Sequence, residues 1–522
     1  MTGCTTRREF LKRSTLTGIG LSIAAAAPAQ GDSPGEKSSS ARAGSPLLER
    51  LPANRPTPQQ AAWHDLELGM FVHFGLYAVA GRFTGITWVP EGANPLYSGS
   101  LQPVDPGIFN PVAFDAAKWV ATAQAGGARY LLLTAKHHDG FCLWPTATTP
   151  HSVKATRWRG GRGDLVGEVA RACHAAGLRF GFYLSPWDAY AWQTLKLSDA
   201  EYDKYYMRQL TELLTQYGKI SEVWWDGAGA SQRRHDWRAY YRLVKTLQPD
   251  SVIMGAGCSD VRWIWEVPEE QGLGLDPNWY VVHVPELTAE KPVRTGGMSL
   301  WPKDQPAGDY WWPGESYLAM DRFWSGATRL GFEEHLKKDT AHTAEDVVAA
   351  WHRTVGYGLN LVVNFVPRPR GDLPPAEVER FSQAGKTLRR IYARNLAIAG
   401  TATASRSTAG HGPGQAVDGN PATWWEASDS ARTAWLEMDL GQEVEFDRLA
   451  LREAITQGQA IAAFRLLAKR GGGWEQVCAG GTVGRQRIAL FRPLRASRVR
   501  VELTTTGRPA TLREIGLYRG QE

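Results

Sequence analysis

Residues 220–227 read ISEVWWDG and predict a buried strand that ends on a carboxylate. The Val-Trp-Trp segment favours a pleated, packed surface. Asp226 needs partners there, because a bare carboxylate is costly to bury, and Gly227 lets the backbone turn sharply. Barrel enzymes keep catalytic groups at the carboxyl ends of their strands. Asp226 is therefore a candidate catalytic residue, although an aspartate that caps the next loop or helix would read the same way.

Strand-like and helix-like segments alternate on both sides of this stretch. The predicted strands are residues 69–75, 129–135, 178–184, 251–255 and 359–365, and the predicted helices are residues 114–125, 164–176, 199–217, 236–247, 343–355 and 374–393. Such alternation predicts an α/β fold with a parallel sheet and crossover helices. Over residues 46–394 its natural closed form is a (β/α)8 barrel of the TIM type, with a doubly wound open sheet as the alternative. No Gly-rich phosphate turn follows the first strand, which counts against a nucleotide-binding version.

The composition sets limits on the class of protein. A chain of 522 residues is too long for one core, so we expect two or three domains. The 22 Trp residues exceed what cores need and favour surfaces that stack on flat apolar faces, such as those of sugar rings. The net charge of +6 comes without a dense basic run beside aromatic residues, which argues against nucleic acid as a partner. The five Cys residues are far apart and predict neither a zinc site nor a disulfide framework.

The N-terminus has the pattern of an export signal. Residues 1–29 contain the paired Arg7 and Arg8, a short apolar run and an Ala-Pro-Ala end, as a signal peptide does. The run is too short, and too rich in Ala and Gly, to span a membrane. The paired arginines resemble the twin-arginine signal that exports folded bacterial proteins. We expect residues 30–45 to be a flexible leader, and the mature protein to be periplasmic or secreted, without a membrane partner.

Polar and aromatic residues gather where the predicted strands end. His73 ends the first strand, His137 and His138 follow the second, and Tyr183 lies near the end of the third. These ends converge on one face of a parallel barrel. His137 and His138 would point to opposite sides of a regular strand, and no HxH or HExxH spacing is present, so we expect no metal site. Imidazoles that hydrogen-bond sugar hydroxyls, with Trp and Tyr stacking on the sugar, fit the pattern better.

Glycoside hydrolysis needs a second carboxyl group opposite the first. Asp226 is the candidate nucleophile, so the acid should come from a neighbouring strand end. The nearest acid-rich segment, predicted as a loop, is residues 262–272. It offers Glu266, Glu269 and Glu270, and the residues alone do not choose among them. An exposed acidic loop without a catalytic role is the alternative.

Four stretches of the barrel domain together resemble the α-L-fucosidases of glycoside hydrolase family 29. They are residues 63–75, 135–145, 181–188 and 222–227. The resemblance covers residues 55–394 and implies a retaining hydrolase with Asp226 as nucleophile. It also implies that the fucose ring is held by His73, His137, His138, Tyr183 and Trp224.

Around Cys142 and Trp187 the sequence resembles one subgroup of the family, which prefers α-1,3/1,4-linked fucose. In that subgroup the acid/base residue follows an Arg-Trp pair and stands two residues before a Gly. Residues 262–263 and 270–272 fit this pattern, with about three extra residues between them, so Glu270 is implied and Glu266 and Glu269 are the reserves. Residues 311–324 resemble a substrate-facing loop in which Trp324 walls the methyl group of the sugar.

The implied activity is release of terminal α-1,3/1,4-linked L-fucose from oligosaccharides or glycoconjugates by double displacement, with no cofactor. Retention predicts that the two carboxyl groups stand about 5–5.5 Å apart. One alternative is a non-catalytic protein that binds fucose or other glycans on the same scaffold. The other is an exo-glycosidase of different specificity, such as an α-galactosidase. The oligomeric state stays open.

From residue 395 the helical spacing disappears and short alternating runs begin. They predict a β-sandwich over residues 395–522. Residues 416–425 and 435–441 resemble the discoidin, or factor V/VIII type C, domain, a jelly-roll family that includes carbohydrate-binding modules of family 32. The resemblance implies a structural calcium ion near Asp418 and Asn420. A sandwich that only supports the barrel is the alternative to glycan binding.

Overall fold

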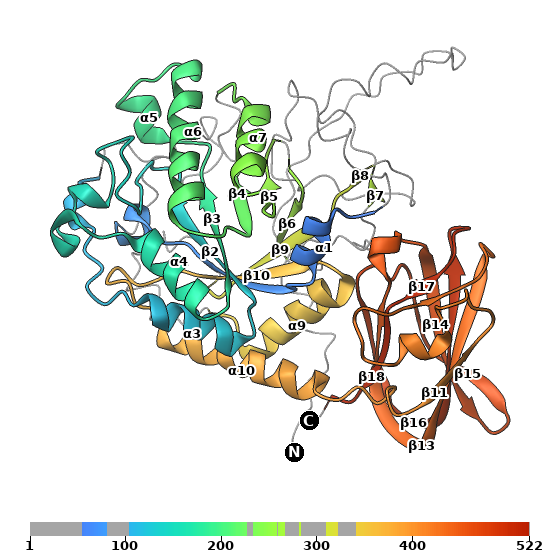
Figure 1. The fold of residues 1–522 in the computed structure, drawn as a ribbon. Coiled ribbons are helices and arrows are strands. Elements are labelled where there is room, and N and C mark those ends of the chain that lie inside the picture. The colour runs from blue at the N-terminus through green and yellow to red at the C-terminus, as the bar shows by residue number, and fades with distance from the viewer. Residues whose placement is uncertain are drawn as a thin grey trace, which may run out of the picture. The chain divides into compact units, whose positions relative to one another are not determined.

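Eight parallel strands follow one another around a barrel in chain order (Figure 1). The computed structural model describes residues 55–80, 104–226, 233–257, 259–266, 281–282, 310–321 and 341–520. The barrel strands are β1 (Leu68–Val72), β2 (Tyr130–Lys136), β3 (Arg179–Leu184), β4 (Glu222–Trp225), β5 (Val252–Gly255), β6 (Arg262–Glu266), β9 (Gly314–Ala319) and β10 (Asn360–Phe365). Their order in the sheet is β5-β4-β3-β2-β1-β10-β9-β6, and a parallel bridge between Met254 and Val261 links its two ends. The predicted barrel is confirmed, and the open sheet is excluded.

Helices cover the outside of this sheet, as Figure 1 shows for α3, α4 and α6. The helices are α1 (Pro58–His64), α2 (Leu76–Val79), α3 (Ala116–Gly126), α4 (Leu165–Ala175), α5 (Ala189–Gln193), α6 (Asp199–Gln216), α7 (Trp237–Leu247), α9 (Ala344–Thr354) and α10 (Pro375–Tyr392). Asp115, Asp164 and Asp236 cap α3, α4 and α7, each accepting a bond from the backbone N–H three residues on. All six predicted helices are confirmed to within two residues at each end.

Two barrel strands were not predicted from the sequence. Residues 262–266, interpreted as part of a loop, form β6, and residues 314–319, interpreted as part of a substrate-facing loop, form β9. The two strands pair in parallel, with Ile264 opposite Ser316. Neither segment has the continuous apolar pattern of a buried strand, because each places a Glu or an Arg in the barrel wall. The prediction of loops at these positions was therefore wrong.

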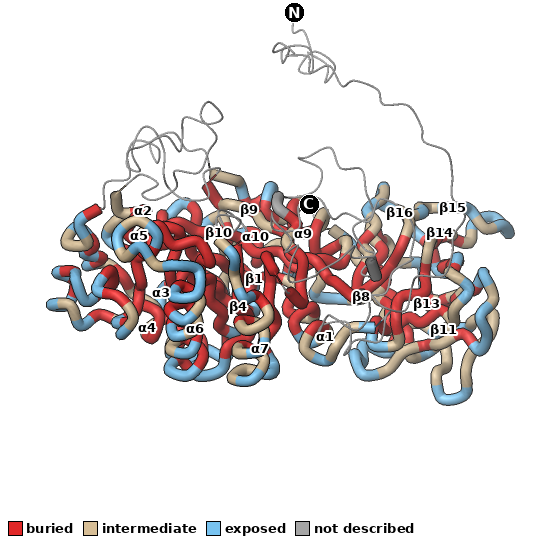
Figure 2. The backbone as a smooth tube through the Cα atoms, turned by 90° about the horizontal axis from the view of Figure 1, so that it is seen from above, coloured by how far each residue is buried: buried red, intermediate tan, exposed pale blue. Residues whose placement is uncertain are grey.

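The strands bury both of their faces. Side chains that point into the barrel form one apolar cluster, which includes Phe71, Tyr183 and Trp224. Side chains that point outward pack under the helices in a separate cluster, as Trp225 does against Trp237 of α7 with ring centroids 5.7 Å apart. Figure 2 shows the buried strands and the exposed outer turns of α6 and α7. Alternation along β4 thus sends Glu222, Trp224 and Asp226 inward and the residues between them outward.

The C-terminal region is an antiparallel sandwich with its own core. Its main sheet contains β11 (Thr401–Ala404), β13 (Thr433–Arg452), β14 (Ile461–Arg470), β15 (Gly473–Gly480), β16 (Arg487–Thr505) and β18 (Glu514–Tyr518). The order is β11-β13-β16-β14-β15, with β18 on β13, while β12 (Trp425–Glu426) pairs with β17 (Thr511–Leu512). A cluster built on Trp425, Leu436 and Phe464 fills the interior. The predicted β-sandwich is confirmed.

A buried ion pair and a half-exposed one join the sandwich to the segment that leads into β1. Arg485, which is 2% exposed, pairs with Glu67, and Arg513 pairs with Asp65 at 3.2 Å. Burial alone would raise the pKa of Glu67, but Arg485 and Arg452 outweigh it and lower that pKa to about 2. Removing one partner of such a pair would leave a buried charge without compensation. The sandwich therefore supports the barrel directly.

The predicted signal peptide and leader, residues 1–45, lie outside the described residues.

A further pair of short strands, β7 (Val281–Val282) and β8 (Tyr310–Trp311), is antiparallel. In the described part of the chain, no helix is both long and apolar enough to cross a membrane.

The close contact of α10 with α3 at Gly385 predicts one effect on stability. A Cβ added at Gly385 of α10 would lie 2.4 Å from the backbone oxygen of Ala125 in α3, and backbone atoms cannot move aside cheaply. Gly385→Ala should lower the free energy of unfolding by about 1–3 kcal/mol, measured by chemical denaturation. Gly414→Ala is the matched control, since nothing lies within 4 Å of its added Cβ. Equal stability of the two variants would contradict this packing.

Candidate active site

The carboxylate of Asp226 lies at the carboxyl end of β4 and is held from two neighbouring strands. The hydroxyl of Tyr183, on β3, donates to Oδ2 of Asp226 at 3.1 Å. His138, which follows β2, places its Nε2 3.2 Å from the same oxygen. The other ring nitrogen of His138 lies 2.6 Å from the hydroxyl of Ser185. Asp226 is only 7% exposed, so these donors replace much of the water that a carboxylate needs.

His73 and His137 line the same end of the barrel. Nδ1 of His73 lies 2.6 Å from the side-chain oxygen of Asn364 at the end of β10. The amide oxygen of Asn364 can only accept a hydrogen bond, so Nδ1 of His73 must carry the ring proton. In the neutral ring, Nε2 then has the lone pair. The ring of His137 stacks on Tyr183 at 5.3 Å and lies 5.8 Å from the ring of His73. The ends of β1 and β2 therefore bring three imidazoles to one place.

Burial keeps two of these imidazoles neutral. It lowers the pKa of His73 to about 4, although the bond to Asn364 and the charge of Asp226 act in the opposite direction. Burial also lowers the pKa of His137 well below 6.5, with a smaller effect from the neighbouring histidines. A neutral imidazole can both donate and accept a hydrogen bond, which suits a ligand with hydroxyl groups.

Trp224 forms an aromatic floor beneath these groups. Its ring lies 5.5 Å from that of Tyr183 and 4.8 Å from that of Trp263 in β6. Its indole N–H donates to Oε2 of Glu315 at 3.1 Å. Sequence reasoning assigned no separate role to Glu315, which lies fully buried on β9 rather than in a loop that faces the substrate.

The structure brings together most of the predicted site residues. They are His73, His137, His138, Tyr183, Trp224 and Asp226. His137 and His138 do not alternate as predicted, because β2 ends at Lys136 and both rings sit in the turn that follows. Glu269, Glu270 and Trp324 lie outside the described residues, and so does the predicted spacing of the two carboxyl groups. The backbone of β6 ends at Glu266.

Sequence reasoning missed Ser185 and Asn364. Each supports a histidine of the site rather than facing outward, and each follows an apolar strand, so the strand-end signal that singled out His73 could have found them. Over the described ranges, no group of three or more His, Cys, Asp or Glu side chains is arranged to hold a metal ion.

Two families match the sequence, one in each domain. The α-L-fucosidase family model matches residues 49–263, and the F5/8 type C domain model matches residues 401–515. The chain is 31% identical to α-L-fucosidase 1 of Arabidopsis thaliana over 84% of its own length and 81% of that relative. It is 27% identical to the human plasma α-L-fucosidase over 66% of its length and 70% of that relative.

A solved structure agrees. The glycoside hydrolase family 29 fucosidase of Ruminococcus gnavus, in complex with fucose, superposes with a TM-score of 0.75 at 25% identity. The match covers 92% of this chain and 98% of that one. The chain belongs to the α-L-fucosidase family. As a fucosidase it is a glycoside hydrolase, and its substrates are fucosylated glycans.

The histidine turn of this fucosidase is held from behind by a buried ion pair. Lys136 contacts Asp188 at 2.8 Å and Gln209 at 2.9 Å, with both charged groups fully buried. Asp188 also caps α5, and the backbone N–H of Ala189 donates to the backbone oxygen of His138 at 2.9 Å. The turn that carries the two histidines is thereby fixed to β3 and α5.

The turn of the sandwich predicted to bind calcium is closed by its own hydrogen bonds. Asp418 accepts from the backbone N–H of Asn420 at 2.8 Å and from the hydroxyl of Thr423 at 2.7 Å. Asn420 accepts in turn from the backbone N–H of Ala422 at 3.0 Å. A calcium ion at this turn stays a prediction.

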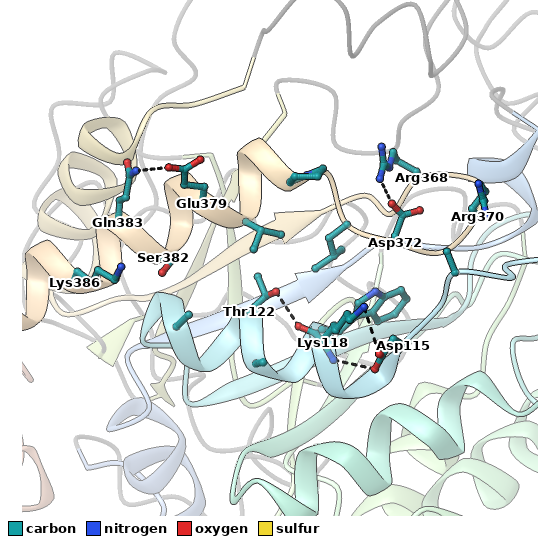
Figure 3. Close-up of a pocket in the computed structure, with 17 residues that line it drawn as sticks. Asp115, Lys118, Thr122, Arg368, Arg370, Asp372, Glu379, Ser382, Gln383 and Lys386 are labelled. Atoms are coloured by element: carbon teal, nitrogen blue, oxygen red, sulfur yellow. Dashed lines mark hydrogen bonds and ion pairs between the residues drawn. The ribbon is translucent and has the colours of Figure 1, made fainter.

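A cavity of about 1070 Å³ between α3 and α10 is not the active site (Figure 3). It contains none of the predicted site residues. Two ion pairs lie along it, Lys118 with Asp115 and Arg368 with Asp372. It is a groove between two surface helices of the barrel.

The bond from Tyr183 to Asp226 predicts a loss of activity. Tyr183→Phe removes a donor from a buried carboxylate, which should lower kcat about tenfold or more for a fucoside. Tyr217→Phe is the matched control, because the Tyr217 hydroxyl donates to Asp164 at 3.3 Å far from the site. Steady-state kinetics measure both variants. Equal rates for the two would show that the Tyr183 bond does not matter for turnover.

Proposed function

We propose that this protein is an exported, retaining α-L-fucosidase that removes terminal α-1,3/1,4-linked L-fucose by double displacement. One observation carries the proposal. Asp226 presents a carboxylate at the carboxyl end of a barrel strand, where Tyr183 and His138 both contact Oδ2. Held by donors on the protein, such a carboxylate is positioned to attack a sugar carbon.

The other groups at this end fit a fucose ring. We propose that His73, His137 and His138 bind its hydroxyls, and that neutral His73 accepts a hydrogen bond from one of them at Nε2. Tyr183 and Trp224 offer aromatic faces to the apolar side of the ring. The fucose complex of the Ruminococcus gnavus fucosidase supports a site for the sugar in this fold. Trp324 is proposed as the wall for the methyl group, on the family resemblance alone.

The proposed reaction has two steps. Asp226 attacks the anomeric carbon while Glu270 donates its proton to the departing oxygen, which forms a covalent fucosyl-enzyme and releases the rest of the glycan. Glu270, now a carboxylate, takes a proton from water as that water attacks the same carbon, which frees fucose and Asp226. Two inversions give net retention. This chemistry uses only two carboxyl groups, so we propose no cofactor for hydrolysis.

The proposed linkage preference and the proposed export are both supported by the sequence alone. The residues around Cys142 and Trp187 support the α-1,3/1,4 preference through their resemblance to one subgroup, and equally fast cleavage of an α-1,2-linked fucoside would contradict it. Residues 1–29 support export to the periplasm or beyond. Recovery of the protein in the bacterial cytoplasm would contradict the proposed export.

Loss of the nucleophile gives the first test. Asp226→Ala should lower kcat by about 10³-fold or more, because no covalent intermediate can form. Added azide should restore turnover by attacking the vacated face, and the product should be a β-fucosyl azide identified by NMR. Asp250→Ala is the matched control, since Asp250 is exposed and forms a surface ion pair with Lys219 at 2.8 Å. Near-normal activity in Asp226→Ala would refute the assignment.

The acid is identified by the leaving group. Glu270→Gln should lower kcat/KM about 10²-fold or more for a fucosylated oligosaccharide, whose departing alcohol needs a proton. It should lower kcat/KM much less for a nitrophenyl fucoside, whose phenol leaves without one. Glu266→Gln and Glu269→Gln serve as matched controls. If one of those two variants shows this selective loss instead, that glutamate is the acid.

A further inference from the structure

Two glutamates touch each other inside the barrel, below the proposed fucose site. Glu222 lies on β4 and Glu315 on β9, and both are 0% exposed. The two carboxyl groups interact, and Oε1 of Glu222 is buried without a hydrogen-bond donor in the described part of the chain. Glu222 is two residues before Trp224 and four before Asp226, so all three project inward from one strand. Two carboxylates cannot hydrogen-bond to each other, because each only accepts. The contact therefore requires a proton.

The surrounding donors decide which glutamate carries that proton. Glu315 accepts from the hydroxyl of Tyr130 at 2.6 Å and from the indole of Trp224 at 3.1 Å, one bond on each oxygen. Glu222 accepts from the indole of Trp63 at 2.8 Å on Oε2. With the proton on Oε1 of Glu222, that oxygen donates to Glu315, which then has three donors. This assignment satisfies every oxygen of the pair.

Within the described residues, neutral hydrogen-bond donors surround the pair. The described groups that face it are Trp63 from α1, Tyr130 from β2 and Trp224 from β4, all neutral donors, with Asn360 of β10 beside Tyr130. Burial raises the pKa of Glu222 well above 4.5, and the negative charge of Glu315 raises it further. Burial raises the pKa of Glu315 to about 7, against the bonds that it accepts. Both shifts favour the protonated form, so the pair holds at least one proton at neutral pH.

We propose that Glu222 and Glu315 form a protonated carboxyl pair, with the proton on Glu222, that positions Trp224 as the floor of the fucose site. Glu315 fixes the indole by accepting its N–H, and Glu222 keeps Glu315 in place without adding a second charge. Neither glutamate touches the sugar in this scheme, so both are positioning residues. The proposal rests on the proposed role of Trp224 in binding fucose.

The proton on Glu222 predicts a pH dependence of stability. In the unfolded chain Glu222 ionises near its ordinary value of 4.5, whereas in the folded protein it stays protonated. Its contribution to stability is therefore complete below about pH 4.5 and is lost as the pH rises towards the folded pKa. Glu222→Gln cannot ionise and keeps the donor.

The measurement compares unfolding midpoints of the wild type and Glu222→Gln between pH 5 and 8. The unfolding constant of the wild type should rise relative to that of the variant by up to tenfold per pH unit. A difference that stays flat with pH would overturn the shared proton. Failure of Glu222→Gln to fold would also overturn it, because the amide reproduces the shape and the donor of a protonated acid.

Kinetics test the positioning of Trp224. Glu222→Gln should keep KM for a nitrophenyl fucoside within about threefold of wild type, as a conservative rescue. Glu315→Gln should raise KM about tenfold or more, because an amide cannot accept from both Tyr130 and Trp224. Equal effects of the two substitutions would overturn the positioning role.

Trp224→Phe separates this proposal from the proposed function. It should raise KM by at least as much as Glu315→Gln does. An unchanged KM in Trp224→Phe would remove Trp224 from the fucose site and with it the positioning role. The pH dependence of unfolding would still report on the shared proton by itself.

Discussion

A carboxyl group inside a barrel is stable only where hydrogen-bond donors surround it, and this constraint shapes the interior of the fucosidase. Glu222, Glu315 and Asp226 all lie within the ring of strands. Their donors are mainly phenols and indoles, such as Tyr183 and Trp224. These side chains donate a hydrogen bond without adding a charge, and they fill space as apolar residues do. Some of the many Trp residues therefore serve to donate hydrogen bonds to buried carboxyl groups, and not to stack on sugars.

The same low-polarity surroundings set the state of the histidines. Burial disfavours a second charge beside Asp226, so His73 and His137 are neutral, and Asn364 sets the tautomer of His73. The buried pair of Lys136 and Asp188 stands behind the histidine turn and neutralises itself. Its geometry holds the turn without changing the net charge that the site presents to a neutral sugar.

The sequence allowed the barrel, the sandwich and most of the site cluster to be predicted, because strand ends in a parallel barrel meet at one face. His73 and Asp226 could be assigned to that face from their positions after apolar runs. The rest depended on three-dimensional contacts. Glu315 looked like a loop residue because a strand pattern forbids an unpaired acid, and its partners Tyr130 and Trp224 come from segments 185 and 91 residues away. The joint placement of His137 and His138 depended on where β2 ends.

The described strand ends also restrict where a second catalytic acid can come from. β5 turns only Val252 and Met254 inward and then reaches Gly255. Acids that follow β2 and β3 are already engaged, Asp139 by a backbone N–H and Asp188 by Lys136. Among the described strands next to β5, β6 ends on an acidic residue and leads into more of them. β5 lies next to β4, and β6 closes the barrel against β5. Because these strands are parallel, the carboxyl end of β6 lies on the same face of the barrel as Asp226. The proposed nucleophile after β4 and the proposed acid after β6 therefore follow strands whose carboxyl ends share one face of the barrel.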